Sequence, residues 1–227
     1  MKAMTDRPIM ARWLLRLLGG CLGLAMAAVP AAAAPRVQTI ELDDQIITPV
    51  TQQYITDAID RADRDGAACL IIRLDTPGGL LESTRVIVKR MMNARVPIVV
   101  HVAPSGARAG SAGVFITLAA NIAAMAPSTN IGAAHPIVSG GGMFNPGEEK
   151  PSQQERREDR ATSGTRHAES GDVMMQKVVN DTVAWITTIA RARGRNADWA
   201  RRAVTASLSV PADEALQEAG SAIDALA

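Results

Sequence analysis

Short apolar runs alternate with amphipathic stretches along most of the chain. The runs have the length of strands, and in the segments between them apolar residues recur at helical spacing. The run at 68–74 is apolar except for Arg73, which is typical of a strand covered on both faces. This alternation predicts an α/β fold. Strands are expected at 37–42, 68–74, 96–102 and 122–125, and the intervening helices at 49–65, 81–93 and 111–120.

The first predicted helix carries clear start and stop signals. Thr48 suits the N-cap, Pro49 suits the first helical position, and Gly66 ends the helix. The last third of the chain is also predicted to be helical, and residues 223–225 are expected to begin a closing strand. The helices of this part are expected at 172–193, 196–203 and 211–219.

Polar residues and glycines replace the alternating pattern between 139 and 171. Met143 and Phe144 are almost the only apolar residues of this segment. Such a stretch buries too little apolar surface to order itself. A long segment of this kind inside a compact domain is either a solvated loop or a mobile lid beside an active site, and the pattern alone favours neither.

The first 34 residues are organised like a secretory signal. Arginines precede an apolar stretch at 17–29, and four alanines at 31–34 stand before Pro35. We expect export, to the periplasm or the extracytoplasmic face of a membrane, with cleavage near Ala34. Without cleavage the same segment would serve as an anchor. The remaining residues, 35–227, are enough for one domain.

Charge and composition argue against nucleic acid as a partner. The whole chain has a net charge of +1, and residues 35–227 hold 20 Lys and Arg against 22 Asp and Glu. No basic footprint remains for a phosphate backbone. Aromatic residues make up only 3% of the chain, which offers little surface for stacking bases.

The sequence indicates neither a metal site nor a cofactor. Its three histidines are scattered, and Cys69 is the only cysteine after the signal, so no metal-ligand spacing appears. A single thiol forms no internal disulfide, and the apolar surroundings of Cys69 indicate a small buried side chain. Gly78 and Gly79 lack the Gly-Lys-Ser/Thr sequel of a phosphate-binding loop.

Two glycine-containing turns each follow a predicted strand. In the first, at 75–79, missing Cβ atoms let backbone N–H groups approach a ligand closely. The second, at 109–113, places the Ser111 hydroxyl at the start of a helix. Together the turns offer a nucleophile, Ser111, and two donors for an oxyanion, the N–H groups of Gly79 and Ala112. Either turn alone is also ordinary turn chemistry.

Three blocks of sequence, in this order, resemble the membrane-bound NfeD-type serine proteases, relatives of signal peptide peptidase and of the Clp protease. The blocks are 74–79, 109–113 and 126–133. The resemblance implies a Clp/crotonase-like fold, a spiral of β-β-α units in a single domain. It also implies an ATP-independent serine endopeptidase that forms a homo-oligomer and takes a hydrophobic peptide or membrane-protein segment as substrate, with stomatin-like proteins as the suggested target.

The resemblance also assigns the catalytic residues. Ser111 matches the nucleophile of the family, and Lys177 matches a lysine on a downstream helix that acts as general base. A lysine takes a proton only while neutral, which requires an apolar environment. Met174 and Val178 would supply one, whereas Asp181, four residues on, would hold Lys177 in an exposed ion pair.

His135 is a rival for the role of base, because it lies about where the Clp protease carries its catalytic histidine. That enzyme also needs an aspartate to orient the ring, and no acid occurs at 201–204, where the similarity would place one. We therefore expect His135 to bind substrate. The other residues expected to bind substrate are Gly78, Gly110, Met143 and Phe144.

Two other functions stay open at this point. A crotonase-like acyl-CoA hydrolase or hydratase would use the same fold and the same paired backbone donors without needing Ser111 or Lys177. A catalytically silent scaffold would bind a membrane partner through the same groove.

Overall fold

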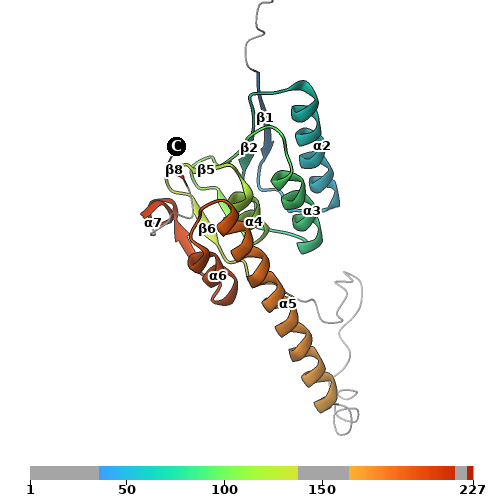
Figure 1. Cartoon of the computed structure of the whole chain (residues 1–227). Coiled ribbons are helices and arrows are strands. Elements are labelled where there is room, and N and C mark those ends of the chain that lie inside the picture. Colours follow the sequence, from blue (N-terminus) through green and yellow to red (C-terminus); the bar gives the residue numbers. More distant parts are fainter. Residues whose placement is uncertain (1–35, 138–163, 218–223, 227) are drawn as a thin grey trace, which may run out of the picture. The chain divides into compact units, whose positions relative to one another are not determined.

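A five-stranded parallel sheet carries the core of the fold (Figure 1). The structure is a computed structural model and describes residues 36–137, 164–217 and 224–226. The strand order is β1-β2-β3-β5-β8, and every neighbouring pair is parallel. The strands are β1 (Val37–Leu42), β2 (Cys69–Leu74), β3 (Ile98–Val102), β5 (Ile122–Met125) and β8 (Ala225–Leu226).

A second, three-stranded sheet consists of β4 (Arg108–Gly110), β6 (Asn130–Gly132) and β7 (Ser209–Pro211). β4 and β6 run parallel, and β6 and β7 run antiparallel. From β3 onward the chain contributes to both sheets in turn: β3 and then β4, a helix, and then β5 and β6. This succession is the β-β-α unit, so the predicted fold class is confirmed.

Helices α2 (Pro49–Asp65) and α3 (Leu81–Met92) follow β1 and β2 and pack against each other. Thr48 is the N-cap of α2, and its hydroxyl accepts a hydrogen bond of 3.3 Å from the Thr51 N–H. Gly66 ends α2 in the left-handed conformation, with φ 60°. The predicted capping residues of α2 are therefore confirmed.

The core is built from the alternate residues of the central strands and from one face of each helix. Leu70, Ile72 and Leu74 of β2 are completely buried, as are Ile59 of α2 and Ile87 of α3. Each such side chain contributes about 1.5–3 kcal/mol when it leaves water, so these strands are fixed in place beneath the turns that follow them.

Helix α4 (Ala112–Ala119) is buried at all eight of its positions, and Thr117 is its only polar residue. Its last carbonyl groups are covered by two arginines from far along the chain. Arg193 donates to Ala119 O at 2.8 Å, and Arg195 donates to Leu118 O at 2.9 Å and to Ala120 O at 2.8 Å. Cations at this end also suit the helix dipole.

Arg195 is itself held by the closing strand. It is buried and forms an ion pair of 2.6 Å with Asp224, whose carboxylate also accepts from the Ala123 N–H at 2.6 Å. Burial, together with the nearby guanidinium of Arg195, holds the pKa of Arg193 below its ordinary value. The end of α4, the edge of β5 and the start of β8 are thus joined through Arg195.

The C-terminal part contains α5 (Gly164–Ala192), α6 (Ala197–Thr205) and α7 (Ala212–Gln217). α5 begins before the expected residue 172, so the predicted loop at 139–171 is wrong over 164–171, which is helical although it begins and ends with glycine. Residues 138–163 of that loop lie outside the described residues. β4, β6 and β7 were not predicted.

Candidate active site

Ser111 lies at the sharp turn between β4 and α4. It is the N-cap of α4, with φ 47° and ψ −104°, a backbone conformation that residues with a side chain rarely adopt. The Ser111 N–H donates to Gly132 O at 3.0 Å, which ties the turn to the end of β6. Strain of this kind persists only where its surroundings enforce it, and it is characteristic of functional sites.

Gly78 passes directly against Ser111. Its φ is 123°, and a Cβ atom added to Gly78 would lie 2.6 Å from Ser111 Cβ and 3.2 Å from Ser111 Oγ. Gly110 approaches the same turn from the other side, where an added Cβ would lie 2.9 Å from Pro77 O. Only glycine fits at these positions, so both glycines expected to bind substrate lie beside the serine.

Gly79 completes the first turn. The backbone of Ile47 holds this turn through two hydrogen bonds. The Ile47 N–H donates to Gly78 O and the Leu80 N–H donates to Ile47 O, both at 2.8 Å. An added Cβ on Gly79 would overlap the Ile47 backbone. The turn is therefore fixed on the side away from the serine.

Two backbone donors beside Ser111 have no protein acceptor among the residues that the structure describes. They are the N–H of Gly79, which is exposed, and the N–H of Ala112, in the first turn of α4. Both residues line the same cavity as Ser111. The two expected oxyanion donors and the expected nucleophile thus share one site.

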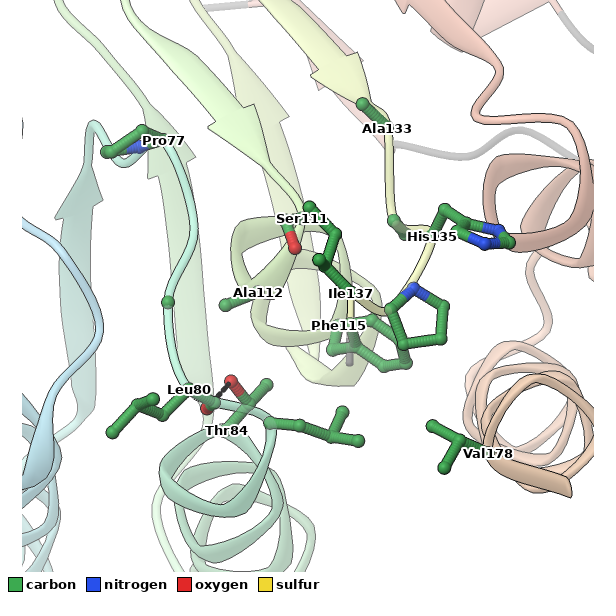
Figure 2. A pocket seen from close by; sticks show the side chains of 14 residues that line it. Pro77, Leu80, Thr84, Ser111, Ala112, Phe115, Ala133, His135, Ile137 and Val178 are labelled. Atoms are coloured by element: carbon green, nitrogen blue, oxygen red, sulfur yellow. Dashed lines mark hydrogen bonds between the residues drawn. The ribbon is translucent and has the colours of Figure 1, made fainter. Parts of the chain in front are cut away.

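The cavity has a volume of about 530 Å³ and mostly apolar walls (Figure 2). α3 supplies Leu81 and Thr84, α4 supplies Phe115, and α5 supplies Val178. The segment after β6 closes the remaining side. Its lining residues are Ala133, Ala134, His135, Pro136 and Ile137, and the first turn adds Pro77, Gly79 and Leu80.

Two stacked aromatic rings support the part of the cavity wall that α4 and α5 form. Phe115 stacks on Trp185, with ring centroids 4.5 Å apart and an interplanar angle of 18°. The guanidinium of Arg85 covers the Trp185 ring at 4.4 Å and pairs with Asp181. One stack therefore joins α3, α4 and α5. Nothing in the sequence indicated these partners of Trp185.

Lys177 is exposed on α5 and is not among the residues that line the cavity. Its neighbour Val178 is the α5 residue that faces the cavity, as Figure 2 shows. The alternative ion pair with Asp181 is not what the structure contains, because the Asp181 carboxylate is paired with Arg85. The structure thus brings together Ser111, Gly79 and Ala112, and leaves Lys177 at the outer surface.

His135 lines the cavity, but its imidazole points away from the Ser111 hydroxyl (Figure 2). Its Nδ1 lies 2.8 Å from the carbonyl oxygen of Val204. Because a carbonyl group only accepts, the proton of the neutral ring lies on Nδ1 and Nε2 is the acceptor. The other expected substrate-binding residues, Met143 and Phe144, lie outside the described residues.

Within the described ranges, no group of three or more His, Cys, Asp or Glu side chains is placed to hold a metal ion. None of the helices within those ranges combines the length and the apolar character that crossing a bilayer requires.

This arrangement places a strained serine and two backbone N–H groups at one cavity of a Clp/crotonase-type fold. The family described as NfeD1b, N-terminal domain, matches residues 36–180, and the chain belongs to this family. The resemblance noted in the three sequence blocks is therefore confirmed.

Among proteins with curated descriptions, the chain is similar to the membrane-bound protease PH1510 of Pyrococcus horikoshii. The two are 31% identical over 208 residues, which cover 89% of this chain and 40% of PH1510. The chain thus spans well under half the length of this relative.

Two solved structures of the 1510-N membrane-bound stomatin-specific protease share the fold. A mutant with serine replaced by alanine gives a TM-score of 0.66 at 31% identity, covering 85% of this chain and 80% of that one. A mutant with lysine replaced by alanine, in complex with a substrate peptide, gives a TM-score of 0.67 at 32% identity, covering 86% and 76%.

Proposed function

We propose that this chain is a serine endopeptidase that cleaves apolar peptide segments, with Ser111 as the nucleophile. The observation that carries the proposal is the shared cavity, in which a strained serine faces two backbone N–H groups that have no acceptor among the described residues. Acyl transfer needs this combination, because the attacked carbonyl oxygen becomes an oxyanion. The relatives named as proteases support the same reaction.

The reaction would follow from this geometry. Ser111 Oγ forms a bond to the carbonyl carbon of the substrate while its proton passes to a general base, and the oxyanion accepts from Gly79 N–H and Ala112 N–H. The C–N bond then breaks, the base returns the proton to the leaving amine, and an acyl-enzyme remains. Water attacks the ester in the same way and releases Ser111.

The walls of the cavity suit an apolar substrate. Leu81, Phe115 and Val178 present hydrocarbon surface to the space beside Ser111. The relatives are named as specific for stomatin. We therefore propose an apolar segment of a stomatin-like membrane protein as the substrate, with His135 and the glycines around Ser111 in contact with it.

The identity of the base is a separate question, because two lysines follow Ser111 in the chain. Lys177 is the lysine that the resemblance indicated, and Lys150 lies outside the described residues. In the relative, the mutated serine and lysine are residues 97 and 138 of its own chain, 41 positions apart. Here Lys150 is 39 positions beyond Ser111, and Lys177 is 66.

The spacing favours Lys150, and the exposure of Lys177 points the same way, because a lysine that acts as a general base needs an apolar environment. Lys177 would act as the base only if α5 or the substrate buried its amine. Replacing each lysine by methionine separates the two. The base is the residue whose loss lowers kcat by about 100-fold or more, and the other variant keeps its activity.

The decisive experiment uses the purified chain from residue 35 with a panel of apolar peptides, followed by mass spectrometry. We expect cleavage by the unaltered chain and none by Ser111→Ala. Ser105→Ala is the matched control, because Ser105 is an exposed serine of the preceding loop. A fluorophosphonate probe should label the chain at Ser111 only.

Three results would contradict the proposed serine peptidase. Undiminished peptide cleavage by Ser111→Ala would remove Ser111 from the reaction. Hydrolysis of acyl-CoA esters that survives in Ser111→Ala would instead support the crotonase-like hydrolase, and peptide binding without any cleavage or labelling would support the silent scaffold.

Export and self-assembly complete the proposal. The relative is named as membrane-bound, and residues 1–34 have the organisation of a secretory signal. We propose that the domain works on the extracytoplasmic side as a homo-oligomer. A fusion of alkaline phosphatase after residue 227 would be active only if the chain is exported, and light scattering of the purified domain would give its mass in solution.

A further inference from the structure

Thr76 is completely buried and is hydrogen-bonded to Gly78, the residue that contacts Ser111. Its hydroxyl donates to Gln45 O at 2.5 Å and accepts from the Gly78 N–H at 3.1 Å. A buried hydroxyl with both roles filled holds its partners firmly, because losing it would leave the buried Gly78 N–H unsatisfied. The hydroxyl thus links the first turn to a loop 31 residues earlier in the chain.

The backbone and methyl group of Thr76 contact the second turn as well. The Thr76 N–H donates to Arg108 O at 2.9 Å, and Thr76 O accepts from the Gly110 N–H at 3.0 Å. Its Cγ2 packs so closely on α4 that a Cβ added to Gly113 would lie 2.8 Å away. One residue therefore touches the turn with the donor Gly79, the strand before Ser111 and the helix after it.

The hydrogen bonds around Thr76 fix the direction of the Gly79 N–H. The Thr76 hydroxyl donates a hydrogen bond to Gln45 O. Two residues later in the chain, the Ile47 N–H donates to Gly78 O at 2.8 Å. In a trans peptide the carbonyl and the next N–H point in opposite directions. Because Gly78 O faces Ile47, the Gly79 N–H must face the other way, toward the cavity.

We propose that Thr76 is a positioning residue that keeps the Gly79 N–H aimed at the oxyanion through the Gln45–Ile47 loop. This role rests on the proposed peptidase function and deepens it. The positioning role of Thr76 depends on its hydroxyl group and not on the volume of its side chain. The methyl group contacts α4, and only the hydroxyl contacts Gln45 and Gly78.

Two substitutions separate these parts. Thr76→Val keeps the shape and removes the hydroxyl, and Thr76→Ser keeps the hydroxyl and removes the methyl group. We expect Thr76→Val to lower kcat for an apolar peptide by about 10- to 100-fold with KM within about twofold, and to slow fluorophosphonate labelling by a similar factor. Thr76→Ser should keep kcat within about threefold, because it retains the hydroxyl.

Amide hydrogen exchange tests the geometry independently of any activity. The Ile47 N–H should be protected in the unaltered chain and in Thr76→Ser, and should exchange faster by about 10-fold or more in Thr76→Val, while Leu70 in the sheet keeps its protection. Unchanged protection of Ile47 in Thr76→Val would overturn the proposal. So would equal loss of kcat in both variants, since packing would then be the cause.

The two hypotheses fail differently. If the unaltered chain neither cleaves peptides nor reacts with the probe, the peptidase is wrong while the exchange data still decide what Thr76 holds. If the unaltered chain is active and Thr76→Val has the same kcat, the proposed peptidase function is supported and the proposed role of Thr76 is wrong.

Discussion

Gly78 and Ser111 are in such close contact that neither tolerates a larger neighbour. A single added carbon on Gly78 would lie 2.6 Å from Ser111 Cβ, closer than non-bonded carbons approach. The serine is thereby confined between the first turn and its own helix. This confinement explains how the unusual φ of 47° at Ser111 is maintained.

Gly78→Ala should therefore abolish activity in a chain that still folds. The new methyl group must displace Ser111 or the turn, and we expect kcat/KM to fall by about 100-fold or more in the peptide assay. Gly106→Ala is the matched control, because Gly106 also has positive φ, 92°, but open space around its added Cβ. If both variants lose activity equally, backbone strain and not the contact with Ser111 is responsible.

The stack of Phe115 on Trp185 should appear as an energetic coupling. In a double-mutant cycle with Phe115→Leu and Trp185→Leu, measured by denaturant unfolding, we expect about 0.5–1.5 kcal/mol of interaction free energy. Tyr54→Leu, on the exposed side of α2, replaces Trp185→Leu in the control cycle. That cycle should be additive within about 0.5 kcal/mol. Additivity in both cycles would show that the stack adds nothing beyond burial.

Arg195 should contribute strongly to stability although it lies at the far end of α4 from Ser111. Arg195→Met removes two bonds to helix carbonyls and leaves the Asp224 carboxylate without its partner, so we expect a loss of about 3–5 kcal/mol in the free energy of unfolding. Arg201→Met, at a half-exposed arginine, should change it by less than about 0.5 kcal/mol. Similar losses in both would remove the special role of Arg195.

Asp63 should make the domain sensitive to acid. Burial alone would raise the pKa of this carboxyl, but hydrogen bonds from Arg90 and from the N–H groups of Val96 and Arg95 outweigh it and hold the pKa below the ordinary 3.8. Between the two values the unfolded chain binds more protons than the folded one, so this stabilisation is present above pH 3.8 and is lost as the pH falls through the lowered pKa.

The measurement is the free energy of unfolding as a function of pH. Asp63→Asn should be less stable than the unaltered chain at neutral pH, by about 1–3 kcal/mol, and the difference should shrink below pH 3.8. Asp213→Asn removes a charge from an exposed position and should leave the pH dependence unchanged. A difference that stays constant with pH would contradict this account of Asp63.

The sequence predicted those parts of the fold that local chemistry decides. Thr48 and Gly66 delimit α2 as expected, and Ser111 opens α4 as expected, because a cap or a turn depends on a few adjacent residues. β4, β6 and β7 were missed because three residues carry no periodicity, and β6 pairs with a strand about 80 residues later in the chain.

The candidate site also contains residues that the local sequence identifies and residues that only the fold brings together. Gly79, Ala112 and Ser111 each belong to a local turn and could be named from the sequence. The partner of Thr76 is 31 residues away and that of Phe115 is on another helix, so only the packed structure brings them together. Whether Lys177 faces the cavity depends on the rotation of α5, and Val178 takes that place.

The arginines that cover the end of α4 are synthesised long after the helix itself. The carbonyls they bind precede them by 74 to 77 residues, so α4 emerges from the ribosome before the guanidinium groups that cover it exist. The helix that begins at Ser111 is therefore completed only after Arg195 has joined the fold.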